Sequence, residues 1–147
     1  MTISVPIQKL HPRAKLPTYG SSDAAGADLY ALTDGPVDIL PGQTVLLHTG
    51  LALAVPQGYV GLVHARSGLA TRQGLAPANK VGVIDADYRG ELMVALHNHS
   101  QHTQTICDGD RIAQLLITPC LTACFETVDQ LEDTRRGSGG FGSTGLR

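Results

Sequence analysis

The sequence is poor in charged residues, which make up 16% of its 147 residues, while hydrophobic residues make up 42%. The surface of a small monomer usually carries more charge. Two interpretations stay open: part of the surface is buried by self-association, or the surface is polar but uncharged. The formal net charge of -2 also lacks the basic excess typical of proteins that coat nucleic acid. Nucleic acid is therefore not an expected partner, and any anion site must be local.

Long apolar runs and paired cysteines are missing as well. No stretch offers the roughly 18 uninterrupted apolar residues that span a bilayer, and residues 1–15 contain no apolar signal-peptide core. The cysteines, Cys107, Cys120 and Cys124, are odd in number, which favours a reducing compartment over a disulfide framework. We expect a soluble, cytoplasmic protein without membrane contact, in which these cysteines are buried as small hydrophobic residues.

The length fits one domain, because chains of this size can bury a single core. Neither an internal repeat nor a linker divides the sequence. From Thr134 onward the chain is glycine-rich and has no hydrophobic periodicity, so it cannot form a core of its own. We predict one β domain at residues 1–133 and a flexible C-terminal arm at residues 134–147.

Frequent glycines and prolines leave little room for a long helix and favour short strands. Residues 43–55 and 59–64 are apolar and β-branched, and they flank the turn Pro56-Gln57-Gly58, which predicts a β-hairpin. Further strands are predicted at residues 81–84, 91–97, 111–118 and 122–128, with a turn at Asp108-Gly109. The expected class is an all-β sandwich, jelly roll or barrel.

One short helix is predicted at residues 67–73, with Ser67 as its cap. Arg66 precedes it, and the free N–H groups of a helix N-terminus favour an anion, so this segment is a candidate phosphate site. An isolated Arg-Ser-Gly tripeptide is more often an ordinary helix cap beside a surface arginine. The residues alone leave both interpretations open.

A carboxylate follows the apolar run at residues 81–84. Asp85 stands at the end of this predicted strand, and Tyr88 comes three residues later. A carboxylate in such a position can act as a general base. Aspartates at the mouth of a hairpin, Asp87 included, more often form a turn by bonding to the backbone.

The arm combines anion donors with one aromatic ring. Its donors are Arg135, Arg136, Ser138, Ser143 and Thr144. Glycines between them allow backbone N–H groups to converge on a phosphate. Phe141 is suited to stack on a nucleobase, worth about 1 to 3 kcal/mol. The alternative is a glycine-rich tail without function.

Five segments resemble, in order and approximate spacing, the five motifs of trimeric dUTPases. They are AGADLYA at 25–31, ARSGLA at 65–70, GVIDADYRGEL at 82–92, GDRIAQLLI at 109–117 and RGSGGFGSTG at 136–145. The resemblance implies a jelly-roll-like β-barrel or sandwich that assembles as a homotrimer with shared active sites, each built from three chains. It implies Mg²⁺-dependent hydrolysis of dUTP to dUMP and pyrophosphate. That reaction limits uracil incorporation into DNA and supplies dUMP for thymidylate synthesis.

The resemblance also implies residue roles. Asp85 would be the general base that activates water for attack on the α-phosphorus, Gln114 an amide donor, and Arg136 the group that neutralises developing phosphate charge. Tyr88 would pack against deoxyribose and exclude a 2′-hydroxyl. The remaining substrate-binding residues would be Arg66, Ser67, Gly68, Asn79, Val81, Gly82, Val83, Ile84, Met93, Phe141, Gly142, Ser143 and Thr144. Those of the third motif would read the uracil edge, and the arm would close over the site with Phe141 stacked on the base.

Asp28 would lie near Mg²⁺ and contact it through water, because Mg²⁺ retains water and takes other ligands from substrate phosphates. Arg111 is expected to form a structural ion pair rather than to contact substrate. No motif covers His97, His99 and His102. We interpret them as surface or interface histidines rather than a zinc site, since no suitably spaced cysteine or carboxylate accompanies them.

Two other functions remain to be weighed. A dCTP deaminase resembles these enzymes in fold, but it needs a glutamate acid/base where this sequence offers Asp85 and Tyr88. A non-catalytic binding module would retain dUTP without releasing pyrophosphate, although the combination of Asp85, Gln114 and Arg136 favours catalysis.

Overall fold

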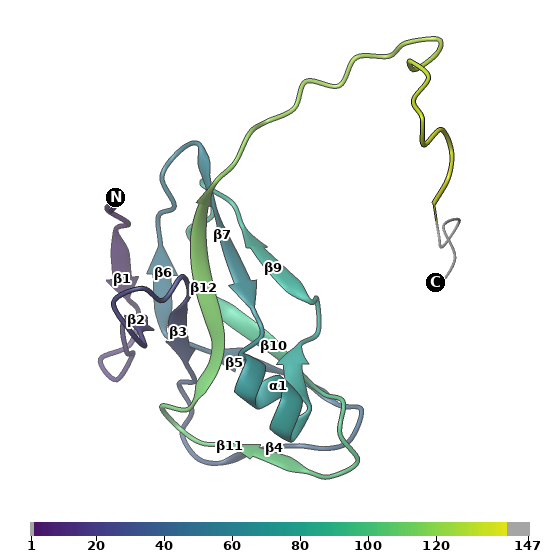
Figure 1. Ribbon diagram of the computed structural model, residues 1–147. Coiled ribbons are helices and arrows are strands. Elements are labelled where there is room, and N and C mark those ends of the chain that lie inside the picture. Colours follow the sequence, from purple (N-terminus) through teal and green to yellow (C-terminus); the bar gives the residue numbers. More distant parts are fainter. Residues whose placement is uncertain (1, 141–147) are drawn as a thin grey trace.

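The computed structural model describes residues 2–140, which form short β-strands and a single short helix (Figure 1). The strands are β1 (Ile7–Lys9), β2 (Thr18–Tyr19), β3 (Ala27–Tyr30), β4 (Val37–Ile39), β5 (Thr44–His48), β6 (Leu51–Leu53), β7 (Tyr59–His64), β8 (Leu75–Pro77), β9 (Val81–Ile84), β10 (Met93–Asn98), β11 (Gln104–Ile106) and β12 (Arg111–Pro119). The helix α1 spans Ser67–Gln73. The expected all-β, jelly-roll-like class is confirmed.

All strand pairs are antiparallel and form four sheets. The largest has the order β2-β3-β12-β7-β9, and a second has the order β5-β10-β8. Two smaller sheets join β1 to β6 and β4 to β11. Strand β12 is central, because it pairs with β3 on one side and with β7 on the other. It therefore brings segments from the first, second and fourth motifs together.

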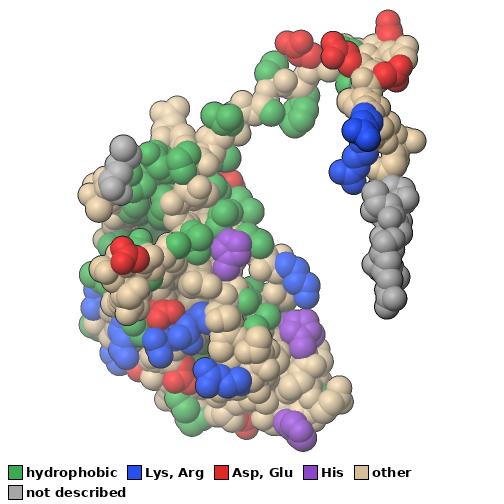
Figure 2. Space-filling view, in the orientation of Figure 1, with side chains coloured by type: hydrophobic (Ala, Val, Ile, Leu, Met, Phe, Trp, Pro, Cys, Tyr) green, Lys and Arg blue, Asp and Glu red, His purple; other side chains and the backbone are tan. Residues whose placement is uncertain are grey.

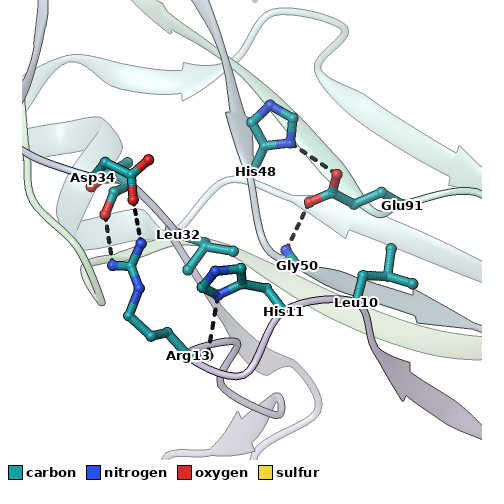
Figure 3. A pocket seen from close by; sticks show the side chains of 9 residues that line it. Leu10, His11, Arg13, Leu32, Asp34, His48, Gly50 and Glu91 are labelled. Carbon is teal, nitrogen blue, oxygen red and sulfur yellow. Dashed lines mark hydrogen bonds and ion pairs between the residues drawn. The ribbon is translucent and has the colours of Figure 1, made fainter.

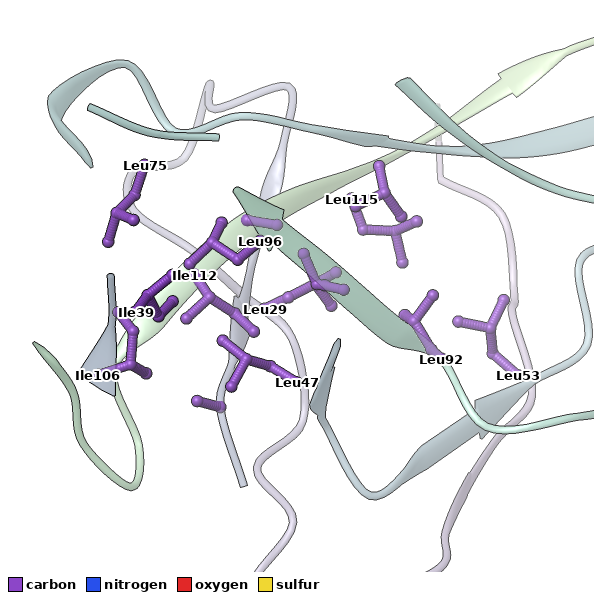
Figure 4. Packing of buried hydrophobic residues seen from close by; sticks show 14 of the residues in the cluster. Leu29, Ile39, Leu47, Leu53, Leu75, Leu92, Leu96, Ile106, Ile112 and Leu115 are labelled. Carbon is purple, nitrogen blue, oxygen red and sulfur yellow. The ribbon is translucent and has the colours of Figure 1, made fainter. Parts of the chain in front are cut away.

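The core lies between these sheets and is made of aliphatic side chains (Figure 4). Strand β10 alternates as the pleat of a half-buried strand requires, with Val94 and Leu96 buried and Met93 and His97 on the outer face. Leu29, Leu47 and Ile112 are also buried. Burial of each such aliphatic side chain contributes about 1.5 to 3 kcal/mol. This packing holds the motif-bearing strands in fixed relative positions.

The predicted hairpin of residues 43–55 and 59–64 is wrong. Residues 43–55 form two strands, of which β5 pairs with β10 and β6 pairs with β1. Strand β7 pairs instead with β12 and β9. The turn at Pro56-Gln57-Gly58 is present. The strands on either side of it, β6 and β7, do not pair with each other and form their backbone hydrogen bonds with distant segments.

The short helix is confirmed, but its predicted cap is wrong. Arg66 occupies the N-cap position without a side-chain capping bond, and Ser67 is the first helical residue. The helix ends at Gly74, whose φ of 68° and left-handed conformation suit glycine. The Asp108-Gly109 turn is also present, with Gly109 at φ 81°.

The predicted strand at residues 122–128 is wrong for the isolated chain. After Pro119 the chain leaves the β body as an extended segment without strand pairing (Figure 1). Figure 2 shows apolar side chains along it. Leu121 is 97% exposed and Phe125 is 95% exposed. Among residues 2–140, no strand pairs with this segment, and these two apolar side chains are left exposed.

The expected burial of the cysteines is also wrong. Cys107, Cys120 and Cys124 are free and exposed, because Cys107 precedes a surface turn and the other two lie on the extended segment. Within residues 2–140, no helix is long and apolar enough to cross a membrane.

Candidate active site

One cavity of about 270 Å³ collects residues from the first, second and fourth motifs. Asp28 comes from β3, Gln114 from β12, and Arg66 and Ser67 from the junction of β7 and α1. Its full lining is Gly20, Ala24, Gly26, Asp28, Arg66, Ser67, Gly68, Arg111 and Gln114. The pairing of β12 with both neighbours explains why residues so distant in sequence meet here.

An ion-pair network orients the arginine of this cavity. The Arg66 Nε donates to Asp28 Oδ1 at 2.8 Å, and Arg111 Nη1 donates to Asp28 Oδ2 at 3.1 Å. Asp28 is 15% exposed and Arg66 25% exposed, so the pair is largely protected from solvent. Two arginines share one carboxylate, and the cavity therefore keeps an excess of positive charge suited to an anion. The ion pair expected for Arg111 is present.

Gln114 is held against two backbone segments. Its Nε2 donates to the Ala65 carbonyl at 2.8 Å. Gly26 lies so close that a Cβ at position 26 would overlap Gln114 Oε1. Because Gly26 has no side chain, the Gln114 amide can approach β3. This close approach explains the glycine in the first motif.

A second cavity, of about 220 Å³, lies beside β9 and β10. It contains the predicted residues Val83, Ile84, Asp85, Tyr88 and Met93, together with Leu46, Glu91 and Leu92. Val83 is 61% exposed, whereas Gly82 is buried against Val63. β9 lies at the edge of the five-stranded sheet and, within residues 2–140, pairs only with β7, so its other edge and the apolar side chains form a wall suited to a flat ring.

Asp85 is exposed at the start of the turn that follows β9. Its main-chain carbonyl accepts the Tyr88 N–H at 3.2 Å, so the backbone closes the turn. Among residues 2–140, the Asp85 carboxylate has no hydrogen-bond partner, and it does not serve as the turn-forming side chain. The carboxylate is therefore accessible to a water molecule.

The two cavities do not meet within one chain. Ile84 pairs with Gly61, so Asp85 follows beside Val60, whereas Arg66 lies at the other end of the same extended segment. The six positions from Val60 to Arg66 span about 20 Å at the rise of a β-strand. Asp85 and Arg66 of a single chain are thus too far apart to contact the same phosphate group.

The remaining predicted residues lie elsewhere. Asn79 is exposed at the turn before β9, with its Nδ2 near Gly82. Arg136 lies on the extended segment, where its Nε donates to the Gly139 carbonyl at 2.9 Å. The structure therefore does not bring Arg136 to Asp85 or Gln114 in one chain. Phe141, Gly142, Ser143 and Thr144 lie outside the described residues.

No group of three or more potential ligands that could hold a metal ion occurs within residues 2–140. The His97 and His99 rings lie 4.4 Å apart between centroids, and His97 Nδ1 is 2.8 Å from Thr44 Oγ1. Partial burial, with charge repulsion from His97 and Lys80, lowers the pKa of His99. The described geometry gives these histidines no metal-binding arrangement.

Comparison with known proteins identifies the family. The family model described as dUTPase matches residues 12–145. The chain belongs to the dUTPase family. A relative from Syntrophotalea carbinolica, named deoxyuridine 5'-triphosphate nucleotidohydrolase, is 50% identical over 145 residues, which cover 99% of each chain. A relative of the same name from Desulfitobacterium hafniense is 53% identical over 133 residues, covering 90% of this chain and 88% of its own.

Solved structures of this family have the same fold. The Staphylococcus bacteriophage 80alpha dUTPase with dUpNHpp has a TM-score of 0.85 and 27% identity, covering 99% of this chain and all of that chain. A variant of the dUTPase from phage phi11 of S. aureus, described with a structural Mg(II) ion, has a TM-score of 0.80 and 25% identity, covering 89% of this chain and all of that chain.

Sequence reasoning missed two residues that shape the cavities. Gly26 was read only as part of a motif, although its closeness to Gln114 depends on the pairing of β3 with β12. Glu91 was not assigned a role, yet it lines the Asp85 cavity and bonds to His48 at the end of β5 and to the Gly50 amide. Its position at the end of the third motif was the available signal.

Proposed function

We propose that this protein hydrolyses dUTP to dUMP and pyrophosphate, with Asp85 as the general base. The observation that carries the proposal is the unpaired Asp85 carboxylate beside Tyr88, at the rim of a cavity lined by exposed β9 backbone. Membership of the dUTPase family and relatives at about 50% identity support the reaction. Asp85 would orient a water molecule and accept its proton as the water oxygen attacks the α-phosphorus. Pyrophosphate would leave from the opposite side.

Each active site would be completed by other copies of the chain in a homotrimer. The separation of about 20 Å between Asp85 and Arg66 along one chain supports this arrangement. The exposed apolar residues of the extended segment, which include Leu121, Phe125, Val128 and Leu131, also need a second surface to pack against. Asp85 of one chain would then face the Arg66 and Gln114 cavity of a neighbour, and the arm of a third chain would close over both.

Base selection would occur at β9 and the turn that follows it. The exposed backbone groups of β9, from Val81 to Ile84, can pair with the edge of uracil, whereas cytosine presents the opposite donor and acceptor pattern. A buried group left unpaired by the wrong base reduces binding. The methyl group of thymine would clash with the backbone of β9 and its turn, where there is room only for the hydrogen of uracil. Tyr88 would lie against deoxyribose, where a 2′-hydroxyl has no room.

Phosphate binding would combine the cavity of one chain with an arm from another. Arg66, Ser67 and Gly68 line the cavity, and Gln114 adds an amide. Arg136 of the arm, with Ser143 and Thr144, would neutralise charge that develops on the phosphates. Phe141 would stack on uracil.

Mg²⁺ fits these residues only through water. Both Asp28 oxygens already accept bonds from arginines, yet a carboxylate oxygen has a second lone pair that can accept a bond from a metal-bound water. Mg²⁺ would supply charge neutralisation at the phosphates, its usual role in such sites. We propose that Asp28 orients one of its water ligands while holding Arg66 in place.

In the cell, the same reaction would limit uracil incorporation into DNA and supply dUMP for thymidylate synthesis. The test is pyrophosphate release from dUTP, dTTP, dCTP and UTP with Mg²⁺, measured side by side for the native protein and Asp85→Asn. We expect release from dUTP alone and its loss, by roughly 10²-fold or more, in the variant. Ammonia released from dCTP would favour a deaminase, and dUTP binding without pyrophosphate release would favour a binding module.

A further inference from the structure

The Tyr88 ring is held by the backbone that follows it. Its hydroxyl donates to the Glu91 carbonyl at 3.0 Å. Gly90 lies against the same phenol, and a Cβ at position 90 would overlap the Tyr88 hydroxyl. Because the ring is otherwise exposed, at 41%, its position depends on where the backbone of residues 90 and 91 lies.

The side chain of Glu91 fixes that backbone to the end of β5 and to the turn that follows it. Glu91 Oε1 accepts the Gly50 N–H at 2.8 Å, and Oε2 lies 2.8 Å from His48 Nδ1 (Figure 3). The next residue, Leu92, donates its N–H to the Leu51 carbonyl at 2.7 Å. Residues 91 and 92 are therefore attached to the connection between β5 and β6, at residues 48–51.

The surface to which Glu91 is attached is rigid. Gly50 has a φ of 68°, and a Cβ there would lie 2.7 Å from Leu32 and 2.9 Å from Ala14. Leu51 is fully buried, and the Thr49 hydroxyl donates to the Leu92 carbonyl. This connection is closely packed and cannot move with the Tyr88 loop. The bonds of the Glu91 carboxylate therefore hold the Tyr88 loop in a fixed position.

Glu91 also separates two cavities. It lines the 220 Å³ cavity with Asp85 and Tyr88, and it lines a neighbouring cavity of about 270 Å³ that contains His48 and, on its far side, Asp34 (Figure 3). The carboxylate points toward His48 and Gly50, which line the neighbouring cavity (Figure 3). The bound Glu91 carboxylate is linked to Tyr88 through the Glu91 main-chain carbonyl, which accepts the Tyr88 hydroxyl.

We propose that Glu91, anchored by His48 and the Gly50 amide, is a positioning residue that sets the Tyr88 ring for exclusion of ribonucleotides. The inference rests on the proposed hydrolysis of dUTP, and it adds a specificity determinant behind the substrate cavity. Loss of the Glu91 carboxylate would let the backbone at residues 90 and 91 relax. The Tyr88 hydroxyl would lose its fixed acceptor, and the space for a 2′-hydroxyl would open.

The experiment compares kcat/KM for dUTP and UTP in the native protein, Glu91→Ala, Glu91→Gln and His48→Ala. In Glu91→Ala we expect the preference for dUTP over UTP to fall by roughly tenfold, as expected for a lost hydrogen-bonded anchor. Glu91→Gln keeps an acceptor for the Gly50 amide and should retain the preference to within about threefold. His48→Ala removes one of the two anchors from an imidazole that is 57% exposed, and its effect should fall between these two.

Asp34→Asn is the matched control. Asp34 lines the cavity that contains His48, but its carboxylate bonds to Arg13 and, among the described residues, has no hydrogen bond to residues 88–92. Its dUTP to UTP preference should equal that of the native protein. If Glu91→Ala does not fold, His48→Ala decides the question. An unchanged preference in every folded variant, even with lower thermal stability, would reduce Glu91 to a structural role and overturn the proposal. Failure of the native protein to hydrolyse dUTP would instead overturn the proposed reaction.

Discussion

Gly26 leaves no room for any side chain, because a Cβ there would overlap Gln114 Oε1. Gly26→Ala should therefore displace the amide from the phosphate cavity and lower kcat/KM for dUTP by roughly 10-fold to 100-fold, as for other small misplacements of catalytic groups. Gly20→Ala is the control, since Gly20 lines the same cavity with no atom within 4 Å of the added carbon. Steady-state kinetics of both variants check this expectation, and equal activities would contradict it.

The ionised Glu91 carboxylate stabilises the fold in a pH-dependent way. Burial alone would raise the pKa of Glu91, but the hydrogen bond with His48 and the Gly50 amide outweigh it, so the pKa lies below the ordinary value of 4.5. A lowered pKa in the folded state means that the stabilisation is fully present above about pH 4.5 and is lost as the pH falls through the lowered pKa.

The melting temperatures of the native protein and Glu91→Gln should therefore differ at pH 6 to 7, where the native protein should be more stable. The difference should shrink as the pH falls below 4.5. Thermal melts followed by circular dichroism across this range measure it. A difference that does not change with pH would show that the variant acts through packing rather than through charge.

Residue identities were the most predictable part of the site. Arg66, Ser67, Gly68 and Gln114 were selected from their motifs, and the structure collects them in one cavity. Glu91 could not be assigned from sequence, because its partners His48 and Gly50 are more than forty positions away and meet it only through the pairing of β10 with β5. A local pattern carries no information on such contacts.

At the level of elements, strand positions were more predictable than strand partners. The strands predicted at residues 81–84 and 111–118 agree with β9 and β12, because an apolar, β-branched run favours an extended local conformation. Residues 43–64 were read as a hairpin, yet their hydrogen bonds go to β1, β9, β10 and β12. Pairing across the fold depends on which apolar faces meet in the core, and a turn signal does not determine it.

The predicted strand at residues 122–128 has the composition of a strand but no strand partner in the part of the chain that the structure describes. We expect it to pair or pack in the trimer, whereas residues 134–147 act only on substrate. Removal of residues 134–147 should leave a folded trimer with dUTP hydrolysis lowered by 10²-fold or more, because Arg136 is lost. Removal of residues 120–147 should also abolish the trimer. Light scattering and pyrophosphate release on both truncations test this division.

For the whole molecule, the proposed sharing of active sites between chains makes a quantitative prediction. Arg66→Ala retains Asp85, and Asp85→Asn retains Arg66, so each variant should be nearly inactive alone. When equal amounts are unfolded and refolded together, a site is complete if one chain supplies Asp85 and its neighbour supplies Arg66. The chance is one half times one half, so about one quarter of native activity should return.

Mixing the two folded variants without unfolding is the control, because it leaves their trimers intact. Activity that stays near zero after joint refolding would mean that both residues must come from the same chain. That result would contradict the argument from the 20 Å separation along β7. About half of native activity, together with an active Arg66→Ala variant, would mean that Arg66 is dispensable, because half of the sites would still carry Asp85.

The five-stranded sheet is complete only when β12 has paired with β3 and β7. The extended segment begins directly after β12. During synthesis, the segment that a neighbouring copy would receive emerges after the strands of the core. Each chain can therefore close its own core first and recruit its neighbours afterward. Refolding should show a phase independent of protein concentration, seen by circular dichroism, followed by a concentration-dependent phase in which activity appears.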